Sequence, residues 1–412
     1  MADRGRPALP VGLGIDDFDA GLFLPLSVVY ATTVAGLSLG LAGAVVTAGT
    51  VAGLLVPPPA GRLVDRIGPK PVVISAQLVQ AVGAFGYLAA HGAGGVLIAT
   101  VLLAGGRQLF FCALVGLVAD AAGEGPKDRP FAVVMMVRSA GFGLGTLTVG
   151  VLLGGAGPPG YRVAVVGYGC CLLVAAIVLA TLLRVPHRPA PSARPVSVLR
   201  DRPFLGLIGV SGLFVLVVDF FLVGTPVFVL DRLPGPAWLP GAMPALHTAL
   251  TSSLGTFALR CTRRWDRPRG MALGAAGHVL WCAITLAAIA VPHGWLPGNL
   301  PAGVVVLALA SLVFGPRADA LAEASAPAES RGRYLAAFQY AFTGAQVVAP
   351  AVAGLFAVSV WLPFAVVVAC SVTAALGLRV LVPRLPAGAT LPGTSRARRP
   401  CPRRRSRGTR CP

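Results

Sequence analysis

Hydrophobic positions in this chain form long apolar runs, and short polar loops separate them. Most runs are close to the ~20 residues that an α-helix needs to cross the roughly 30 Å hydrocarbon layer of a membrane. The pattern therefore predicts an all-α integral membrane protein of about twelve transmembrane helices. We expect them at residues 18–36, 41–60, 71–90, 96–120, 130–154, 161–184, 203–229, 238–259, 270–290, 301–322, 333–356 and 360–382.

The polar loops alternate in charge. Every second loop is basic, and the loops between them carry almost no charge. By the positive-inside rule, we expect the basic loops and both termini to lie in the cytoplasm and the protein to lie in the plasma membrane. An even number of helices agrees with two termini on one side. The lysines and arginines of the basic loops are Arg62, Arg66, Lys70, Lys127, Arg129, Arg188, Arg194, Arg200, Arg202, Arg260, Arg263, Arg264, Arg267, Arg269, Arg331 and Arg333.

The longest polar segment divides the predicted helices into two sets of six. We expect an N-terminal bundle at residues 1–184, a cytoplasmic linker at 185–203, a C-terminal bundle at 204–384 and a disordered basic tail at 385–412. Two similar hexapeptides, Ala119–Glu124 and Ala318–Glu323, end helices about half the chain apart, as duplicated halves require. Chance similarity in alanine-rich sequence is the alternative explanation.

Composition supports a membrane protein and argues against several other classes. The chain is 56% hydrophobic and 12% charged, with a mean hydropathy of +0.79. Its net charge of +19 lies in the basic loops and the tail, which indicates membrane orientation and no nucleic-acid partner. Eight cysteines form no disulfide or metal-binding pattern, and no cofactor is expected. We find no cleavable signal peptide, because Asp16, Asp17 and Asp19 stand just before the first apolar run.

The loop between the second and third predicted helices carries a motif. It reads Gly61-Arg62-Leu63-Val64-Asp65-Arg66-Ile67-Gly68-Pro69-Lys70. This sequence resembles the signature loop of the major facilitator superfamily, G-x-x-x-D-R-x-G-x-R/K, and matches every fixed position. The resemblance implies two pseudo-symmetric six-helix bundles that alternate access to a central site. It covers the chain from about residue 16 to residue 384.

The residues of this loop have separate expected roles. Gly61 and Gly68 permit close helix approach and a tight turn. Asp65 can cap a helix N-terminus, and the family resemblance places it against the start of the eleventh helix, near residues 331–334. Arg66 and Lys70 can reach acids and lipid phosphates. Such contacts imply a cytoplasmic gate. In the second half, Arg263 stands where the repeat would have Asp, so no symmetric second contact is expected.

Ionisable residues inside predicted helices are candidates for transport chemistry, because a charge at bilayer depth is costly. Asp219 is our candidate for proton coupling, with a permanently paired or protonated Asp as the alternative. Arg107 is similar to the arginine of the family's helix-4 motif, and pairing with backbone carbonyls is its alternative. Arg317, Asp319 and Glu323 are expected to pair locally near the cytoplasm, and His247 is a cavity or packing residue.

Glycines are frequent in the fifth predicted helix, including Gly141, Gly145, Gly150 and Gly154. Such spacings let membrane helices pack closely. They are also similar to the helix-5 motif of drug-exporting antiporters, but the Gly-Pro pair of that motif is absent. Close packing without any link to export is the alternative.

These observations predict a secondary transporter, not an enzyme, and the side chains favour one class of substrate. Phenylalanines such as Phe214, Phe220 and Phe221 favour a small amphipathic molecule, exported by a monomer in exchange for protons. No nucleotide-binding loop is present, which favours an ion gradient as the energy source. The alternatives are an uptake porter for a sugar or other metabolite and a membrane sensor that transports nothing.

Overall fold

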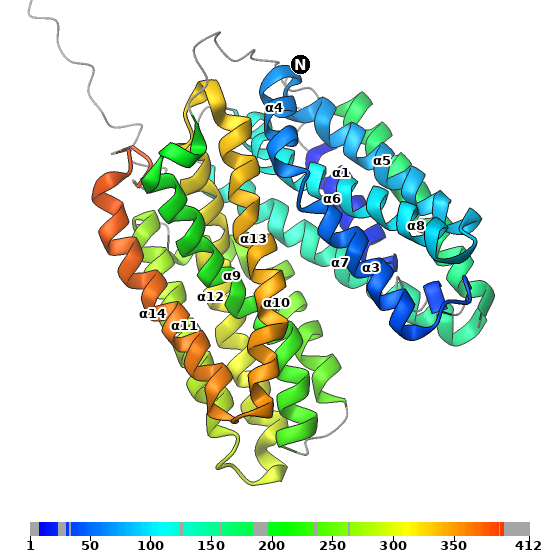
Figure 1. Ribbon diagram of the computed structural model, residues 1–412. Coiled ribbons are helices and arrows are strands. Elements are labelled where there is room, and N and C mark those ends of the chain that lie inside the picture. Colours follow the sequence, from blue (N-terminus) through cyan, green and yellow to red (C-terminus); the bar gives the residue numbers. More distant parts are fainter. Residues whose placement is uncertain are drawn as a thin grey trace, which may run out of the picture.

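Apolar runs form helices throughout the part of the chain that the computed structural model describes (Figure 1). The described residues are 8–23, 30–32, 34–123, 127–156, 158–183, 197–233, 238–262, 264–386 and 388–390. No strand occurs among them. A helix satisfies its backbone hydrogen bonds within one segment, which hydrocarbon surroundings require. The predicted all-α class is confirmed.

The first bundle is formed by the helices before residue 183. They are α1 (Ala8–Phe23), α3 (Leu39–Gly53), α4 (Pro57–Ile67), α5 (Pro69–Ala89), α6 (Gly92–Ala122), α7 (Asp128–Ala156) and α8 (Pro158–Leu182). Helices α3 and α4 are bent by 44° relative to each other, where the predicted helix 41–60 meets three prolines. Proline lacks the N–H of a regular helix, so the break falls there.

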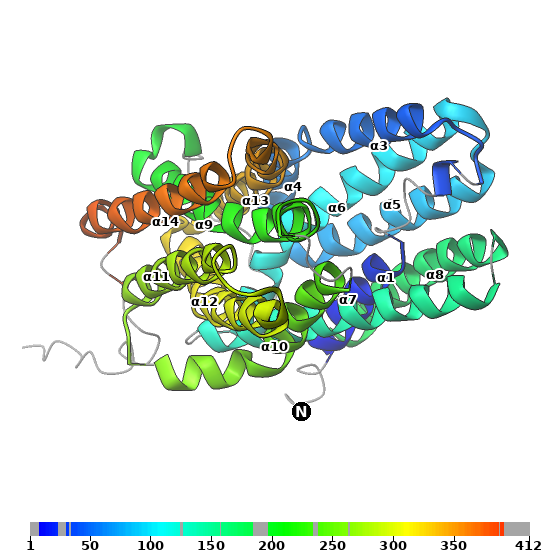
Figure 2. The same ribbon diagram turned by 90° about the horizontal axis from the view of Figure 1, so that it is seen from below.

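The second bundle follows the same plan beside the first (Figure 2). Its helices are α9 (Arg202–Val227), α10 (Leu239–Thr262), α11 (Arg267–Ala287), α12 (Leu296–Ser325), α13 (Arg331–Gly354) and α14 (Trp361–Leu381). Within the described ranges, nine helices of the two bundles are long and apolar enough to cross a membrane, or ten with the bent pair counted as one span. The two-bundle layout agrees with the prediction.

One boundary was predicted wrongly in a way that matters for the site. Helix α1 begins at Ala8 and not at residue 18, so Asp16, Asp17 and Asp19 lie inside the helix. Among the described residues, helix α1 also ends at Phe23, before the predicted limit at residue 36, and α4 continues to Ile67, beyond the predicted limit at residue 60. The remaining helices end within about five residues of their predicted limits. Residues 184–196, most of the predicted linker, lie outside the described residues, as does the tail after Thr390.

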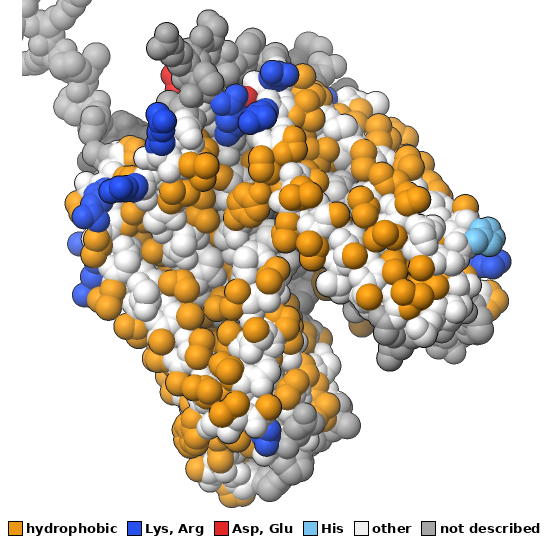
Figure 3. All heavy atoms as spheres, viewed as in Figure 1, with side chains coloured by type: hydrophobic (Ala, Val, Ile, Leu, Met, Phe, Trp, Pro, Cys, Tyr) orange, Lys and Arg blue, Asp and Glu red, His pale blue; other side chains and the backbone are white. Residues whose placement is uncertain are grey.

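The two bundles contact each other at one end and diverge toward the other (Figure 1). On the face shown in Figure 3, most lysine and arginine side chains gather at the contact end, and the rest of the surface is largely hydrophobic. A hollow separates the bundles at the opposite end in the same view. We call the contact end the basic end.

Candidate functional site

A cavity of about 720 Å³ lies between the two bundles. Helices of both bundles contribute to its walls, as a central site for a small molecule requires. Asp17, Arg107 and Arg138 come from the first bundle, and Asp319 comes from the second. The remaining walls are mostly apolar, so these charges are the groups that can orient a ligand or hold a proton.

The best-defined polar contact of the cavity joins α1 to α7. Arg138 donates from Nε to Oδ2 of Asp17 at 2.5 Å and from Nη2 to Oδ1 at 3.1 Å. Both side chains are largely buried, with exposed fractions of 22% and 10%. A two-bond arginine–carboxylate pair fixes both side chains in one plane.

Close packing of the two helices makes this pair possible. A Cβ atom at Gly141 would collide with the carbonyl oxygen of Gly14, and one at Gly145 would collide with that of Phe18. The predicted packing glycines Gly141 and Gly145 thus lie directly against α1. The surroundings of Gly150 and Gly154 are outside the description.

Two further carboxylates lie beside this pair on α1. Oδ1 of Asp16 accepts a hydrogen bond from Nε2 of Gln77 at 2.9 Å. Asp19 is 2% exposed, and its Oδ2 has no hydrogen-bond partner in the described part of the chain. Asp16, Asp17, Asp19 and Arg138, which pairs with Asp17, were not predicted as site residues from the sequence. Apolar residues already recur at helical spacing from Ala8 onward. This spacing could have shown that the helix begins before the three acids and contains them.

Arg107 lines the same cavity from α6. Its guanidinium lies 5.2 Å from the centre of the Phe111 ring, a cation–π arrangement. No hydrogen bond to a backbone carbonyl is found for it within the described residues, so the pairing alternative is not seen.

Asp219 lies on α9, where its Oδ2 is buried and lacks a hydrogen-bond partner in the described ranges. It is not among the residues that line the cavity. Its proposed part in proton coupling stays a prediction.

The second bundle supplies the opposite wall. Asp319 and His247 line the cavity there, and Asp319 is close enough to Arg138 for their charges to interact. The expected local pairing of Asp319 with Arg317 and Glu323 is wrong. Arg317 instead donates to the hydroxyl of Thr262 at 2.6 Å.

The aromatic residues of the cavity differ from those expected. Phe214, Phe220 and Phe221 are buried in the core of the second bundle and do not face the cavity. Periodicity could not separate these positions, because α9 is apolar on every face. The phenylalanines that line the cavity are Phe111, Phe131, Phe142, Phe314, Phe338 and Phe342.

Two glutamine side chains of the cavity wall join the bundles. Gln108 Nε2 on α6 donates to the Thr343 hydroxyl on α13 at 3.0 Å. Gln339 Nε2 on α13 donates to the carbonyl oxygen of Phe111 at 3.0 Å. Cys112 on α6 packs against Ala60 on α4 and Ala336 on α13. Direct contacts between α4, α6 and α13 therefore close the space between the bundles here.

The motif lies at the basic end, against the other bundle. Most of it is helical and does not form the predicted loop, because α4 continues to Ile67 and only Gly68 separates it from α5. Oδ1 of Asp65 accepts a hydrogen bond from the Gly332 N–H at 2.6 Å, and Nε of Arg333 lies 3.3 Å from its Oδ2. Gly332 opens α13, so the carboxylate meets a helix N-terminus. A Cβ on Gly61 would stand 2.7 Å from the Arg333 Cα. Gly68 has φ = +84° between α4 and α5, a conformation that favours glycine.

Lys70 does not pair with an acid in the described part of the chain. Lys70 Nζ donates to the carbonyl oxygens of Ala180 and Leu183 at 2.9 and 2.6 Å, at the C-terminal end of α8. The unpaired carbonyls of a helix end attract a cation, and they lie nearer than any acid. Arg66 is exposed, with no hydrogen bond or ion pair to another described residue.

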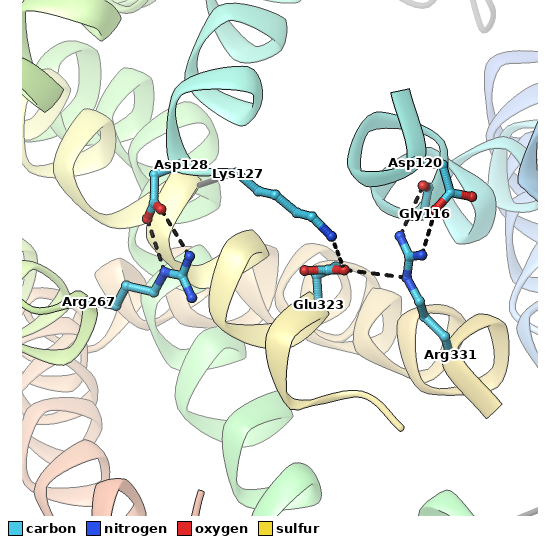
Figure 4. Close-up of polar contacts among 7 residues, drawn as sticks. All are labelled: Gly116, Asp120, Lys127, Asp128, Arg267, Glu323 and Arg331. Atoms are coloured by element: carbon cyan, nitrogen blue, oxygen red, sulfur yellow. Dashed lines mark hydrogen bonds and ion pairs between the residues drawn. The ribbon is translucent and has the colours of Figure 1, made fainter. Parts of the chain in front are cut away.

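Ion pairs continue this contact across the basic end (Figure 4). Arg331 on α13 donates to Asp120 at 2.6 Å and to the carbonyl oxygen of Gly116 at 3.1 Å, both on α6. Glu323 on α12 lies 2.5 Å from the Lys127 nitrogen and 3.6 Å from Nε of Arg331. The Arg331–Asp120 and Lys127–Glu323 pairs join one bundle to the other, whereas Glu323 and Arg331 both belong to the second bundle.

A further ion pair joins the two bundles at the starts of α7 and α11. Arg267, at the start of α11, donates to both carboxylate oxygens of Asp128, at the start of α7, at 3.1 and 2.9 Å (Figure 4). Two side chains pair here, whereas Asp65 accepts a hydrogen bond from a backbone N–H. Arg263 lies outside the described residues, so the expectation that rests on it stays untested.

Comparison with known proteins gives a consistent family. The family model described as Major Facilitator Superfamily matches residues 11–315. The chain is 27% identical over 285 residues to "Multidrug resistance protein MdtH" of Edwardsiella ictaluri, covering 67% of each protein. It is 29% identical over 279 residues to an uncharacterised MFS-type transporter of Mycobacterium tuberculosis, covering 65% of this chain and 62% of that one.

Solved structures share the fold. A bacterial homologue of the iron transporter ferroportin in the outward-facing state has a TM-score of 0.76 at 13% identity, covering 92% of this chain and 100% of the other. The transporter FucP in the outward conformation has a TM-score of 0.71 at 15% identity, with coverages of 92% and 99%.

Proposed function

Because this chain belongs to the major facilitator superfamily of transporters, we propose that it is a secondary active transporter that exports a small amphipathic molecule in exchange for protons. The family and the apolar helices make it a multi-pass membrane protein. The cavity between the bundles is the proposed binding site, and rocking of one bundle against the other is the proposed motion.

The single observation that carries the proton-coupling part is the Asp17–Arg138 pair on the cavity wall. A carboxylate at bilayer depth that faces a cavity can take up a proton from one side and release it to the other. Protonation of Asp17 removes the anionic partner of Arg138, so proton binding changes the charge of the wall that a substrate contacts. Asp219 and Arg107 remain our predicted further members of the coupling machinery.

The charge distribution supports an orientation. Placing the basic end in the cytoplasm puts the ion pairs of Asp65, Asp120, Lys127 and Asp128 on the cytoplasmic side. Both termini are then cytoplasmic, and the protein functions as a monomer in the plasma membrane. These four contacts constitute the proposed cytoplasmic gate, which is closed here, while the hollow faces outward.

Two observations favour export of an amphipathic molecule. Six phenylalanines line the cavity and offer apolar contact for a ring system. The similar protein of Edwardsiella ictaluri is named for multidrug resistance. Asp17 and Asp319 add charge for a polar end of the molecule.

A second candidate function is uptake of a sugar or another polar metabolite. The cavity also contains Gln108, Gln339 and Gln346, whose amides suit hydroxyl groups. Such a substrate would use the same fold and the same gate. The direction of transport and the substrate selectivity would differ from those of the proposed exporter.

Accumulation of a fluorescent lipophilic cation in efflux-deficient bacteria tests the proposal. Cells expressing the wild type should accumulate less dye than empty-vector cells, and a protonophore should abolish the difference. Asp17→Asn and Asp219→Asn should both restore accumulation. Asp266→Asn is the control, because the Asp266 carboxylate is partly exposed, lies 3.7 Å from Nε of Arg269 and does not line the cavity. Accumulation equal to empty vector, with folded protein in the membrane, would contradict export and direct the search to uptake.

A further inference from the structure

The chain does not leave the protein surface when α14 ends. After a short turn at Val382–Arg384, the C-terminal segment (residues 385–390, with Ala387 outside the description) folds back over the basic end of the second bundle. Leu385 is 7% exposed and Ala389 is 0% exposed. Both belong to the same apolar cluster as Met271 on α11. The segment is thus packed into the bundle, although the sequence analysis assigned it to a disordered tail.

This segment binds Arg267, the residue that also binds the other bundle. Nη1 of Arg267 donates to the carbonyl oxygen of Ala389 at 2.8 Å, and the Arg267 N–H donates to that of Thr390 at 3.3 Å. Nε and Nη2 donate to Asp128. All three guanidinium nitrogens therefore have an acceptor, and the residue is 6% exposed.

A buried guanidinium needs an acceptor for each of its nitrogens, because an unsatisfied buried charge is costly. The Ala389 carbonyl satisfies the nitrogen that faces away from Asp128 and fixes the plane of the group. Without this carbonyl, the side chain would gain rotamers that turn it toward water and away from Asp128. The segment can therefore stabilise the Arg267–Asp128 contact between the bundles by binding Arg267 alone.

We propose that the C-terminal segment is a component of the cytoplasmic gate. The segment holds Arg267 against Asp128 and so stabilises the state closed to the cytoplasm. The inference rests on the proposed alternating-access function and adds to it a positioning element outside the motif loop. Arg267 and the segment act together, so the loss of either weakens the same contact.

Two native cysteines report on the gate and on folding separately. Cys112 is 0% exposed and lies between the bundles, packed against Ala60 and Ala336. Cys282 is 0% exposed inside the second bundle, in a cluster with Trp281. Opening of the cytoplasmic end should expose Cys112 and leave Cys282 buried. Loss of packing in the second bundle should expose Cys282.

The experiment measures N-ethylmaleimide labelling rates of both cysteines, by peptide mass spectrometry, on full-length protein in lipid nanodiscs. The variants are a stop after Arg384, a stop after Thr390, Asp128→Asn, Asp65→Asn, and Asp128→Asn combined with the first stop. The stop after Arg384 should label Cys112 roughly tenfold faster, as expected for one lost hydrogen bond to a charged group. The stop after Thr390 keeps the segment and should match the wild type. In the Asp128→Asn background, the first stop should add little, because both changes act through Arg267.

Several results would overturn the inference. The inference fails if the stop after Arg384 leaves the labelling rate of Cys112 unchanged, or if both stops change that rate equally. It also fails if the labelling rate of Cys282 rises in parallel, or if the effects of the first stop and Asp128→Asn on the Cys112 rate are fully additive. Asp65→Asn distinguishes this failure from failure of the proposed function. If Asp65→Asn speeds Cys112 labelling and the first stop does not, the segment is no gate component. If neither does, the proposed gate itself is contradicted.

Discussion

Arg138 donates two hydrogen bonds to Asp17 on the wall of the cavity, at 2.5 and 3.1 Å, and thereby ties α7 to α1. The same guanidinium lies within electrostatic range of Asp319 on the opposite bundle. One cation thus interacts with a carboxylate of each bundle, and these bundles are expected to move relative to each other. The charge state of this group should affect both substrate binding and the contact between bundles.

The Asp17–Arg138 pair should be energetically coupled. Asp17→Asn or Arg138→Gln alone leaves a largely buried charge without its partner, which costs about 3–5 kcal/mol in comparable buried pairs. The double variant removes both charges and should recover part of the lost thermal stability, while export stays at least about tenfold below wild type. Melting temperatures and dye export of the four proteins form the measurement. Strictly additive losses of stability would argue against a functional pair.

Gly332→Ala should open the proposed gate. An added Cβ would lie 2.7 Å from Oδ1 of Asp65 and 2.8 Å from the carbonyl oxygen of Gly61, so α4 must move away from α13. We expect Cys112 to react several-fold faster with N-ethylmaleimide. Gly344→Ala on the same helix is the control, since no atom lies within 4 Å of its Cβ position. Equal rates in both variants would mean that this close approach is not needed for closure.

Gly145→Ala should destabilise the first bundle. Its Cβ would overlap the carbonyl oxygen of Phe18 in α1, and overpacking of this kind costs about 1–3 kcal/mol. Gly209→Ala on α9 meets no atom within 4 Å and should leave stability unchanged or slightly higher. Thermal unfolding of the purified variants checks the contrast. A melting temperature unaffected by Gly145→Ala would show that α1 can shift at little cost.

Asp319→Asn should change substrate preference. Asp319 lines the cavity, and no hydrogen bond occupies its carboxylate among the described residues. Its charge is therefore available to a cationic group. We expect export of a permanently charged phosphonium dye to fall about tenfold, the effect of ~1.4 kcal/mol of lost attraction, with export of a neutral compound of similar size nearly unchanged. Equal losses for both compounds would contradict a role in charge selection.

Lys70→Met should weaken the packing of α5 against α8. The ammonium group binds two terminal carbonyls of α8, and loss of such a contact costs roughly 1–2 kcal/mol. Arg66→Met is the matched control from the same loop, because Arg66 is exposed and unpaired in the described part of the chain. The two melting temperatures decide the question. If both variants melt like the wild type, the Lys70 contacts add nothing to stability.

The sequence predicted the membrane class, the helical content and most helix limits well, because apolar length reports directly on burial in lipid. Asp65 could be assigned from its motif, since its spacing to neighbouring glycines is local. The acids of α1 were missed because their role depends on contacts with other helices. Asp16, Asp17 and Asp19 interrupt an apolar run, and a hydropathy pattern cannot distinguish an acid that ends a helix from one that faces a buried arginine.

What the sequence by itself determined is the set of helices, their alternating direction and the motif loop, all of which depend on neighbours along the chain. The tertiary structure decided which side chains face the cavity: Arg138 and Asp319 do, whereas Phe214 lies in the core of its own bundle. It also decided that Arg267 meets Asp128 and the Ala389 carbonyl. Contacts of this kind join helices far apart in the sequence, and their geometry depends on the rotation and depth of each helix, which packing against several neighbours sets together.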